Sequence, residues 1–141
     1  MRPVFQFCLR ARLKNVHILL GDPMNFTDAV KSVITLNYAN FNGRASRSEF
    51  WYFFLFNIVV SIVLGLVDNL ILGFPLLQAI FGLALLIPGL AVSVRRLHDK
   101  DKSGWWLLIA LVPLIGAILL IVWYATEGTP GDNQFGPPPV A

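Results

Sequence analysis

The sequence predicts an all-α membrane protein with three transmembrane helices, preceded by a short amphipathic interfacial helix. Apolar residues make up 56% of the 141 residues and charged residues only 13%, against about 25% charged residues in a typical soluble domain. The mean hydropathy is +0.67. Three long runs carry no charged side chain: 50–67, 70–94 and 105–124. A lone strand in lipid would leave its backbone unpaired, so each run predicts a helix.

The first predicted element is the interfacial helix, between Phe26 and Phe41. Its apolar side chains are spaced as on one helical face, with polar residues elsewhere; they are Phe26, Val30, Val33, Ile34 and Phe41. We expect this helix to lie on the membrane surface or to pack against the other helices, and a lipid-sensing anchor is the alternative. The Asn42-Gly43 pair that follows predicts a turn.

The first transmembrane helix is predicted at 50–67. These 18 residues rise about 27 Å as a helix, close to the roughly 30 Å of a hydrocarbon core. The preceding Ser46-Arg47-Ser48-Glu49 is a capping box, in which the Ser46 side chain accepts from the Glu49 amide while the Glu49 side chain reaches back. Trp51 and Tyr52 stand at the membrane–water interface, where such residues are enriched.

The second and third transmembrane helices are predicted at 70–94 and 105–124. The second run has 25 residues and is long enough to cross with tilt, although Pro75 and Pro88 should bend or shorten it. The third run has 20 residues, and aromatic pairs stand at both of its ends: Trp105-Trp106 and Trp123-Tyr124. This placement is typical of membrane interfaces and supports a third crossing.

The two ends of the chain differ from the single membrane domain predicted at 24–139. Residues 125–141 are rich in Pro and Gly, which predicts a loosely ordered tail. Residues 1–23 fit neither a signal peptide nor a transit peptide, because their apolar piece is short and no small-residue cleavage site follows it. Met24 begins a segment that resembles a natural protein start. We therefore expect residues 1–23 to be an extension outside the native protein.

Positive charge lies on one side of the predicted spans. Seven Lys and Arg residues precede the first span, and four stand between the second and third: Arg95, Arg96, Lys100 and Lys102. The Asp68-Asn69 connection and the tail contain no Lys or Arg. The positive-inside rule then places the N-terminus and the Arg95 loop in the cytoplasm. With three spans, the C-terminus is predicted to lie outside.

The candidate interaction surface is a basic rim at the cytoplasmic ends of the spans. The rim consists of charged and aromatic side chains that flank the apolar runs: Arg44, Arg47, Glu49, Arg95, Arg96, His98, Asp99, Lys102, Trp105 and Trp106. Each basic residue near an anionic leaflet contributes about 1 kcal/mol. We expect the rim to bind anionic lipid or a membrane-protein partner, with generic orientation charge as the alternative. Arg95 or Arg96 is expected to pair with Asp99 or Glu49, and nucleic acid is not expected as a partner.

The polar side chains inside the predicted spans are candidates for hydrogen bonds between helices. They include Asn57, Ser61 and Gln78, and no Asp, Glu, His, Lys or Arg lies in any of the three runs. Ion-coupled transporters normally carry an ionisable residue at membrane depth, so this class is disfavoured. The alternative function is a subunit of a homo-oligomeric transporter or channel, in which several copies line a pathway with these three side chains.

No pattern in the sequence indicates catalysis, a metal or a cofactor. Ser61 and Ser93 have no His or carboxylate at their depth to activate a nucleophile. Asp99 to Gly104 resembles the opening of a calcium loop, but its twelfth position is Ala110, which has no ligand atom on its side chain. Cys8 is the single cysteine, so a site with several thiolates is excluded. We expect no catalytic residue, no metal site and no cofactor.

Four short motifs stand in order along the chain, with the predicted spans between them. They are FNGRASRSEFW from Phe41, RRLHD from Arg95, SGWW from Ser103 and GDN from Gly131. Together they resemble the YhaH-like family of bacterial inner-membrane proteins, domain of unknown function 805, over residues 24–139. The resemblance implies a small multi-pass protein of the bacterial inner membrane, and the family has no established biochemical activity to transfer. A structural or interaction role is our expectation.

Two departures from this family pattern bear on these expectations. Members that resemble this chain usually begin close to the first motif, which agrees with a start at Met24. Ser46 and Ser48 stand where more basic residues are common, which weakens the rim as a clamp for phosphate groups.

Overall fold

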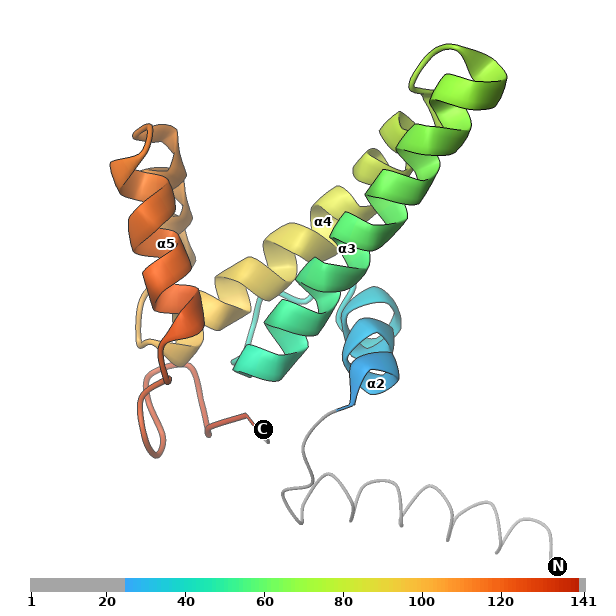
Figure 1. Ribbon diagram of the computed structural model, residues 1–141. Helices are drawn as coiled ribbons and strands as arrows, with labels where there is room; N and C mark the ends of the chain where they lie inside the picture. The colour runs from blue at the N-terminus through green and yellow to red at the C-terminus, as the bar shows by residue number, and fades with distance from the viewer. Residues whose placement is uncertain (1–24, 140–141) are drawn as a thin grey trace, which may run out of the picture.

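The computed structural model describes residues 25–139, and the regular elements there are all helical (Figure 1). This confirms the predicted all-α class. The proposed extension 1–23 and the start at Met24 lie outside the described residues. The α-helices are α2 (Phe26–Lys31), α3 (Arg47–Val67), α4 (Leu76–Asp99) and α5 (Ile115–Ala125). Two π-helical turns (Ser32–Leu36 and Asp68–Leu72) and one 3₁₀ helix (Gly104–Leu111) complete the set.

Two of these helices are long and apolar enough to cross a membrane. Helix α3 continues through the π-helical turn to give 26 residues, Arg47–Leu72, and α4 has 24 residues. Helix α4 begins later than the predicted 70–94, because Gly73 takes a left-handed conformation with φ +73° and Pro75 follows it. Much of the apolar surface of both helices has no protein cover, as at Leu66 and Leu83. Such large uncovered apolar surfaces fit a lipid environment.

A buried carboxylate fixes the turn between α3 and α4. Asp68 is 1% exposed and accepts hydrogen bonds from the backbone amides of Leu77 at 3.1 Å and Gln78 at 2.9 Å. The first amides of a helix have no partner within the helix, and a carboxylate there also complements the helix dipole. Asp68 therefore caps α4 and ties the two long helices together at this end.

The segment 105–124 is a helical hairpin, so the prediction of a third continuous transmembrane helix is wrong. A 3₁₀ helix ends at Leu111, and α5 begins at Ile115. Between them the Ile115 amide donates to the Pro113 carbonyl at 2.8 Å across Leu114, whose φ is +66°. The chain reverses here because Pro113 has no amide hydrogen and disfavours helical backbone in the residue before it. The length and the apolar character of the run contain no sign of this reversal.

The two limbs of the hairpin run antiparallel. Near the tip, Gly116 lies so close to the Ile109 carbonyl that a Cβ there would overlap it. Near the base, the rings of Trp106 and Trp123 meet edge to face at 5.6 Å. The tail after α5 therefore returns to the end of the molecule where α4 ends (Figure 1). The tail thus lies at the same end of the molecule as the Arg95 loop, whereas the sequence predicted the two on opposite sides of the membrane.

Helix α2 packs against the first turns of α3. The Asn25 side chain caps it by accepting from the Asp28 amide at 2.9 Å. Ala29 and Val33 are fully buried, and the Phe26 ring meets Tyr52 of α3 edge to face at 5.9 Å. A short helix thus lies within the predicted segment and packs against α3, and it ends with the π-helical turn at Leu36 instead of reaching Phe41. Its position at a membrane interface stays a prediction.

Candidate functional site

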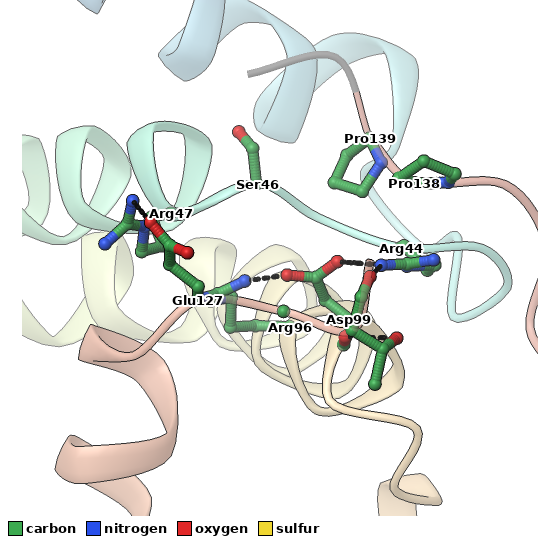
Figure 2. Close-up of a pocket in the computed structure, with 10 residues that line it drawn as sticks. Arg44, Ser46, Arg47, Arg96, Asp99, Glu127, Pro138 and Pro139 are labelled. Atoms are coloured by element: carbon green, nitrogen blue, oxygen red, sulfur yellow. Dashed lines mark hydrogen bonds and ion pairs between the residues drawn. The ribbon is translucent and has the colours of Figure 1, made fainter. Parts of the chain in front are cut away.

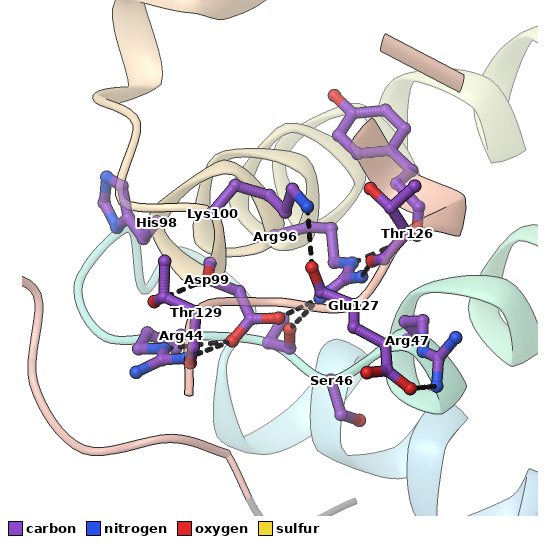
Figure 3. A network of polar contacts seen from close by, with 12 residues as sticks. Arg44, Ser46, Arg47, Arg96, His98, Asp99, Lys100, Thr126, Glu127 and Thr129 are labelled. Carbon is purple, nitrogen blue, oxygen red and sulfur yellow. Dashed lines mark hydrogen bonds and ion pairs between the residues drawn. The ribbon is translucent and has the colours of Figure 1, made fainter. Parts of the chain in front are cut away.

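Asp99, at the end of α4, is the centre of a buried ion-pair network. Arg44 donates to Asp99 Oδ1 from Nε at 2.9 Å and from Nη2 at 2.8 Å. Arg96 Nη1 donates to the other carboxylate oxygen, Oδ2 (Figure 3). The three residues are 8%, 0% and 4% exposed for Arg44, Arg96 and Asp99. One carboxylate therefore pairs with two buried guanidinium groups. Buried charges are tolerated only when they are paired and hydrogen-bonded, as they are here.

A second buried ion pair joins α3 to α4. Arg95 Nη2 donates to Glu49 Oε1 at 3.0 Å, and Arg95 Nη1 lies 3.4 Å from Oε2. Ser32, after α2, also donates to Oε1 at 3.0 Å. The Ser46 hydroxyl accepts from the Glu49 amide at 3.1 Å, which confirms that half of the capping box. The Glu49 carboxylate thus links α3 to α4 and to the π-helical turn after α2.

The main chain of the tail completes the network around Asp99. Arg44 donates to the carbonyls of Thr129 and Gly131, both at 2.7 Å. Arg96 donates to the Tyr124 carbonyl at 3.2 Å and to the Thr126 carbonyl. In return, the Thr129 amide donates to the carbonyl of Asp99 at 2.8 Å. The tail from Thr126 on is therefore held against the end of α4, where the sequence predicted a loosely ordered segment.

Gly128 brings the tail into contact with the Asp99 carboxylate. A Cβ at this position would overlap both carboxylate oxygens of Asp99. Only a residue without a side chain lets the main chain pass here. In the sequence, the glycine content of the tail as a whole is the only signal of Gly128.

His98 anchors the outer part of the tail. Its Nδ1 lies 3.0 Å from the Gly43 carbonyl, which accepts, so Nδ1 carries the hydrogen. The imidazole stacks on the Phe135 ring with 3.9 Å between centroids and 3° between planes. Asn133 donates to the His98 carbonyl at 2.9 Å. Gly43 has φ +85°, which confirms the predicted turn and positions its carbonyl for His98.

An open hollow of about 180 Å³ lies beside this network (Figure 2). It is lined by Arg44, Ser46, Arg47, Arg96, Asp99, Glu127, Gly128, Thr129, Pro138 and Pro139. The guanidinium groups of Arg44 and Arg96 bind Asp99 and the tail, as Figures 2 and 3 show. Arg47 pairs with Glu127 at 3.2 Å, with side chains 50% and 83% exposed. Pairs this exposed contribute little to stability.

Lys102 and three tryptophans lie at the surface of this end, with Trp105 and Trp106 exposed and Lys102 and Trp123 half-buried. The Lys102 ammonium lies 4.7 Å from the Trp123 ring centroid and 5.5 Å from that of Trp106. Trp105 beside them is 79% exposed. We call Lys102, Trp105, Trp106 and Trp123 the Lys–Trp cluster. It stands at the base of the hairpin, next to the buried network.

Lys100 fastens the start of the tail from the other side. Its ammonium donates to the Glu127 carbonyl at 2.6 Å. Partial burial, and then the positive charge of Arg96, lower the pKa of Lys100 below its ordinary value. The contact fixes Glu127 beside the end of α4.

The predicted intramembrane polar residues lie along one face of α3 and against the start of α4. Ser61 donates to Asn57 one turn away at 3.3 Å. A Cβ on Gly65, one turn further, would lie 3.4 Å from Gln78 Oε1, an ordinary van der Waals distance, so the Gln78 side chain packs against α3 at this turn. These contacts are of the kind that packs helices together in membranes. Within residues 25–139, no three His, Cys, Asp or Glu side chains gather as a metal site would need.

A comparison with known protein families identifies the family of this chain. A family model described as "Protein of unknown function (DUF805)" matches residues 38–137, the stretch that contains both long helices, the hairpin and the tail. The chain belongs to the DUF805 family. This confirms the resemblance drawn from the four sequence motifs.

Two relatives of this DUF805 chain are named as inner membrane proteins. It is 46% identical over 108 residues to inner membrane protein YhaH of Escherichia coli K12, covering 73% of this chain and 89% of YhaH. Inner membrane protein YhaI of the same strain is 46% identical over 105 residues, covering 73% and 88%. The uncharacterized protein YiiR is 31% identical over 124 residues, covering 69% and 84%. No solved structure matches the chain.

The structure brings the four motifs of this DUF805 chain together in space. The first motif supplies Arg44 and Glu49, and RRLHD supplies their partners Asp99 and Arg95. The GDN motif supplies the Gly131 carbonyl to Arg44, together with the Asn133 amide that binds the His98 carbonyl. The SGWW motif contributes two members of the Lys–Trp cluster. The predicted rim therefore divides into a buried network, the exposed pair of Arg47 with Glu127, and the Lys–Trp cluster at the surface.

Proposed function

We propose that this chain is a non-catalytic interaction protein of the bacterial inner membrane, and that its Lys–Trp cluster binds the headgroups of anionic lipids. The observation that carries the proposal is the Lys102 ammonium, held over two indole rings beside a third, largely exposed tryptophan. Tryptophan prefers the headgroup level, and a lysine there attracts anionic lipid. The arginines of the buried network have carboxylate and carbonyl partners within the protein, so the exposed cluster is the better candidate.

The charge distribution supports a cytoplasmic position for this end of the molecule. Six basic residues gather there: Arg44, Arg47, Arg95, Arg96, Lys100 and Lys102. The turn at the other end, residues 68–75, has no Lys or Arg. The positive-inside rule then favours two crossings, with the turn outside and the tail in the cytoplasm. This orientation replaces the external C-terminus expected from the sequence.

A reporter fused after Ala141 is expected to register the cytoplasm. The tail is held by Arg44 and Arg96 at the basic end of the molecule, so a fluorescent protein that matures only in the cytoplasm should be bright there. A phosphatase that is active only outside should be silent. The same phosphatase fused after Ile71, in the far turn, is the matched positive control. An active phosphatase after Ala141 would restore a third crossing and contradict the proposed orientation.

Replacing Lys102 with Gln is expected to reduce the binding of anionic lipid about fivefold, since one lysine near an anionic surface contributes about 1 kcal/mol. Native mass spectrometry of the full chain, released from nanodiscs with equal amounts of phosphatidylglycerol and phosphatidylcholine, measures this ratio. The matched control is Lys31→Gln, which removes the same charge from the exposed end of α2. Equal losses in both variants would contradict a specific role of the cluster.

A further inference from the structure

The hairpin formed by residues 104–125 is too short to cross a membrane. Its 3₁₀ limb has 8 residues and α5 has 11. At about 2.0 and 1.5 Å per residue, both limbs are roughly 16 Å long. A hydrocarbon core is about 30 Å thick, so the hairpin matches the depth of one leaflet.

The surface of the hairpin is that of an element inserted tip first. No charged residue occurs from Ser103 to Thr126. Apolar side chains are uncovered on both limbs and at the tip, where Leu111 is 81%, Leu114 is 78% and Ile115 is 64% exposed. The lysine and the tryptophans stand at the opposite end, the base. An element that inserts into one leaflet needs an apolar tip among the acyl chains and a basic, aromatic base at the headgroups. The hairpin has both.

The backbone of the tip is also suited to hydrocarbon, where water is absent and polar groups must find partners within the chain. The Ile115 amide donates to the Pro113 carbonyl at 2.8 Å, and the Gly116 amide donates to the Val112 carbonyl at 3.1 Å. Pro113 itself has no amide hydrogen to satisfy. The Val112 amide also donates, to the Ile109 carbonyl at 3.0 Å, so the turn reverses the chain while these three amides stay bonded.

We infer that the hairpin inserts into a single leaflet, the one on the side of the tail, and acts as a wedge between its acyl chains. The inference rests on the proposed membrane orientation. In that leaflet the protein contributes α3, α4 and both hairpin limbs, whereas the other leaflet contains α3 and α4 alone. The cross-section is therefore larger on the tail side. A membrane that is convex on this side accommodates the protein best, so its partner is a lipid surface of that curvature.

The depth of the hairpin is tested with spin labels on the full chain in vesicles. Cys8→Ser removes the native thiol, and single cysteines at Leu114, Asp101 and Glu127 carry the labels. The wedge predicts a Leu114 label near the bilayer centre. It also predicts that labels at Asp101 and Glu127 are close together and react with reagents from the same face, because the Lys100 ammonium already contacts the Glu127 carbonyl.

Three results would overturn the wedge. Labels at positions 101 and 127 on opposite faces would show a full crossing. A label at 114 at headgroup depth would show a hairpin lying on the surface. Dipolar coupling between position-114 labels of different copies would show that a second copy covers the tip. These results are independent of the headgroup proposal, since loss of lipid selectivity with the tip still deep would contradict that proposal alone.

Curvature is tested by the orientation that the protein adopts in small sonicated and large extruded vesicles. The ratio of outward-facing to inward-facing Glu127→Cys is expected to be at least about twofold higher in the small vesicles. Leu114→Lys, which places a charge at the tip, should abolish the difference. Leu36→Lys, at a position that is 76% exposed outside the hairpin, should preserve it. The same orientation in both vesicle sizes for the native sequence would contradict the wedge.

Discussion

Asp99→Asn is expected to lower the free energy of unfolding by about 3–5 kcal/mol, because removal of one partner leaves buried charge uncompensated. The change keeps the shape of the side chain and removes its charge. Two guanidinium groups, those of Arg44 and Arg96, then remain buried without a carboxylate. The tail should loosen as well, since it contacts both arginines and Asp99 itself.

The measurement is unfolding in mixed micelles of rising SDS content, followed by circular dichroism, with limited proteolysis of the tail as a second readout. Asp101→Asn is the matched control: it makes the same change two residues later, at an exposed position with φ +57° that Asn tolerates well. We expect a shift within about 0.5 kcal/mol for that control. Similar shifts in both variants would refute the central role of Asp99.

The pair of Glu49 and Arg95 is expected to show strong coupling in a double-mutant cycle. Glu49→Met leaves Arg95 buried and uncompensated, so it should cost about 3–5 kcal/mol, and Arg95→Met should also be destabilising. The double variant should recover most of the loss, because an apolar pair of similar volume often replaces a buried ion pair without penalty. The side-chain exposures of 5% for both residues make this pair suitable for the test.

The same unfolding assay measures the free energies of unfolding in this cycle, and a variant of Arg47 serves as the control. Its pair with Glu127 is exposed, so Arg47→Met should change stability by less than about 1 kcal/mol. Additive losses for Glu49 and Arg95, without recovery in the double variant, would show that the two side chains are stabilised by separate contacts.

The two long helices were predictable because length, hydropathy and end signals agree there. Ser46 begins α3 as the capping box requires, and Pro75 stands at the start of α4. The hairpin was not predictable in this way, because its 20 apolar residues satisfy the length rule for a span whether or not the chain reverses. The reversal depends on Pro113 and Gly116, and a transmembrane helix tolerates both residue types when neighbouring helices support it.

The residues of the site were predictable, but their burial was not. Charge placement correctly grouped Glu49, Asp99 and the arginines at one end. The sequence left two pairings open, and the structure selects Arg95 with Glu49 and Arg96 with Asp99. The burial comes from the tail, which the sequence analysis treated as loosely ordered. Its contribution is made by backbone carbonyls, which composition and side-chain patterns do not reveal.

The acceptors that hold Arg44 set the order in which this end of the molecule can be assembled. The carbonyls of Thr129, Gly131 and Gly136 lie 85, 87 and 92 positions after Arg44 in the chain. During synthesis, α3 and α4 are complete while those carbonyls have not yet been made. Arg44 and Arg96 can therefore form their hydrogen bonds to the tail only after the last part of the chain has been synthesised. A chain that stops before residue 126 lacks the tail carbonyls of Thr126, Thr129 and Gly131, so the two guanidinium groups lose these acceptors and this end stays open.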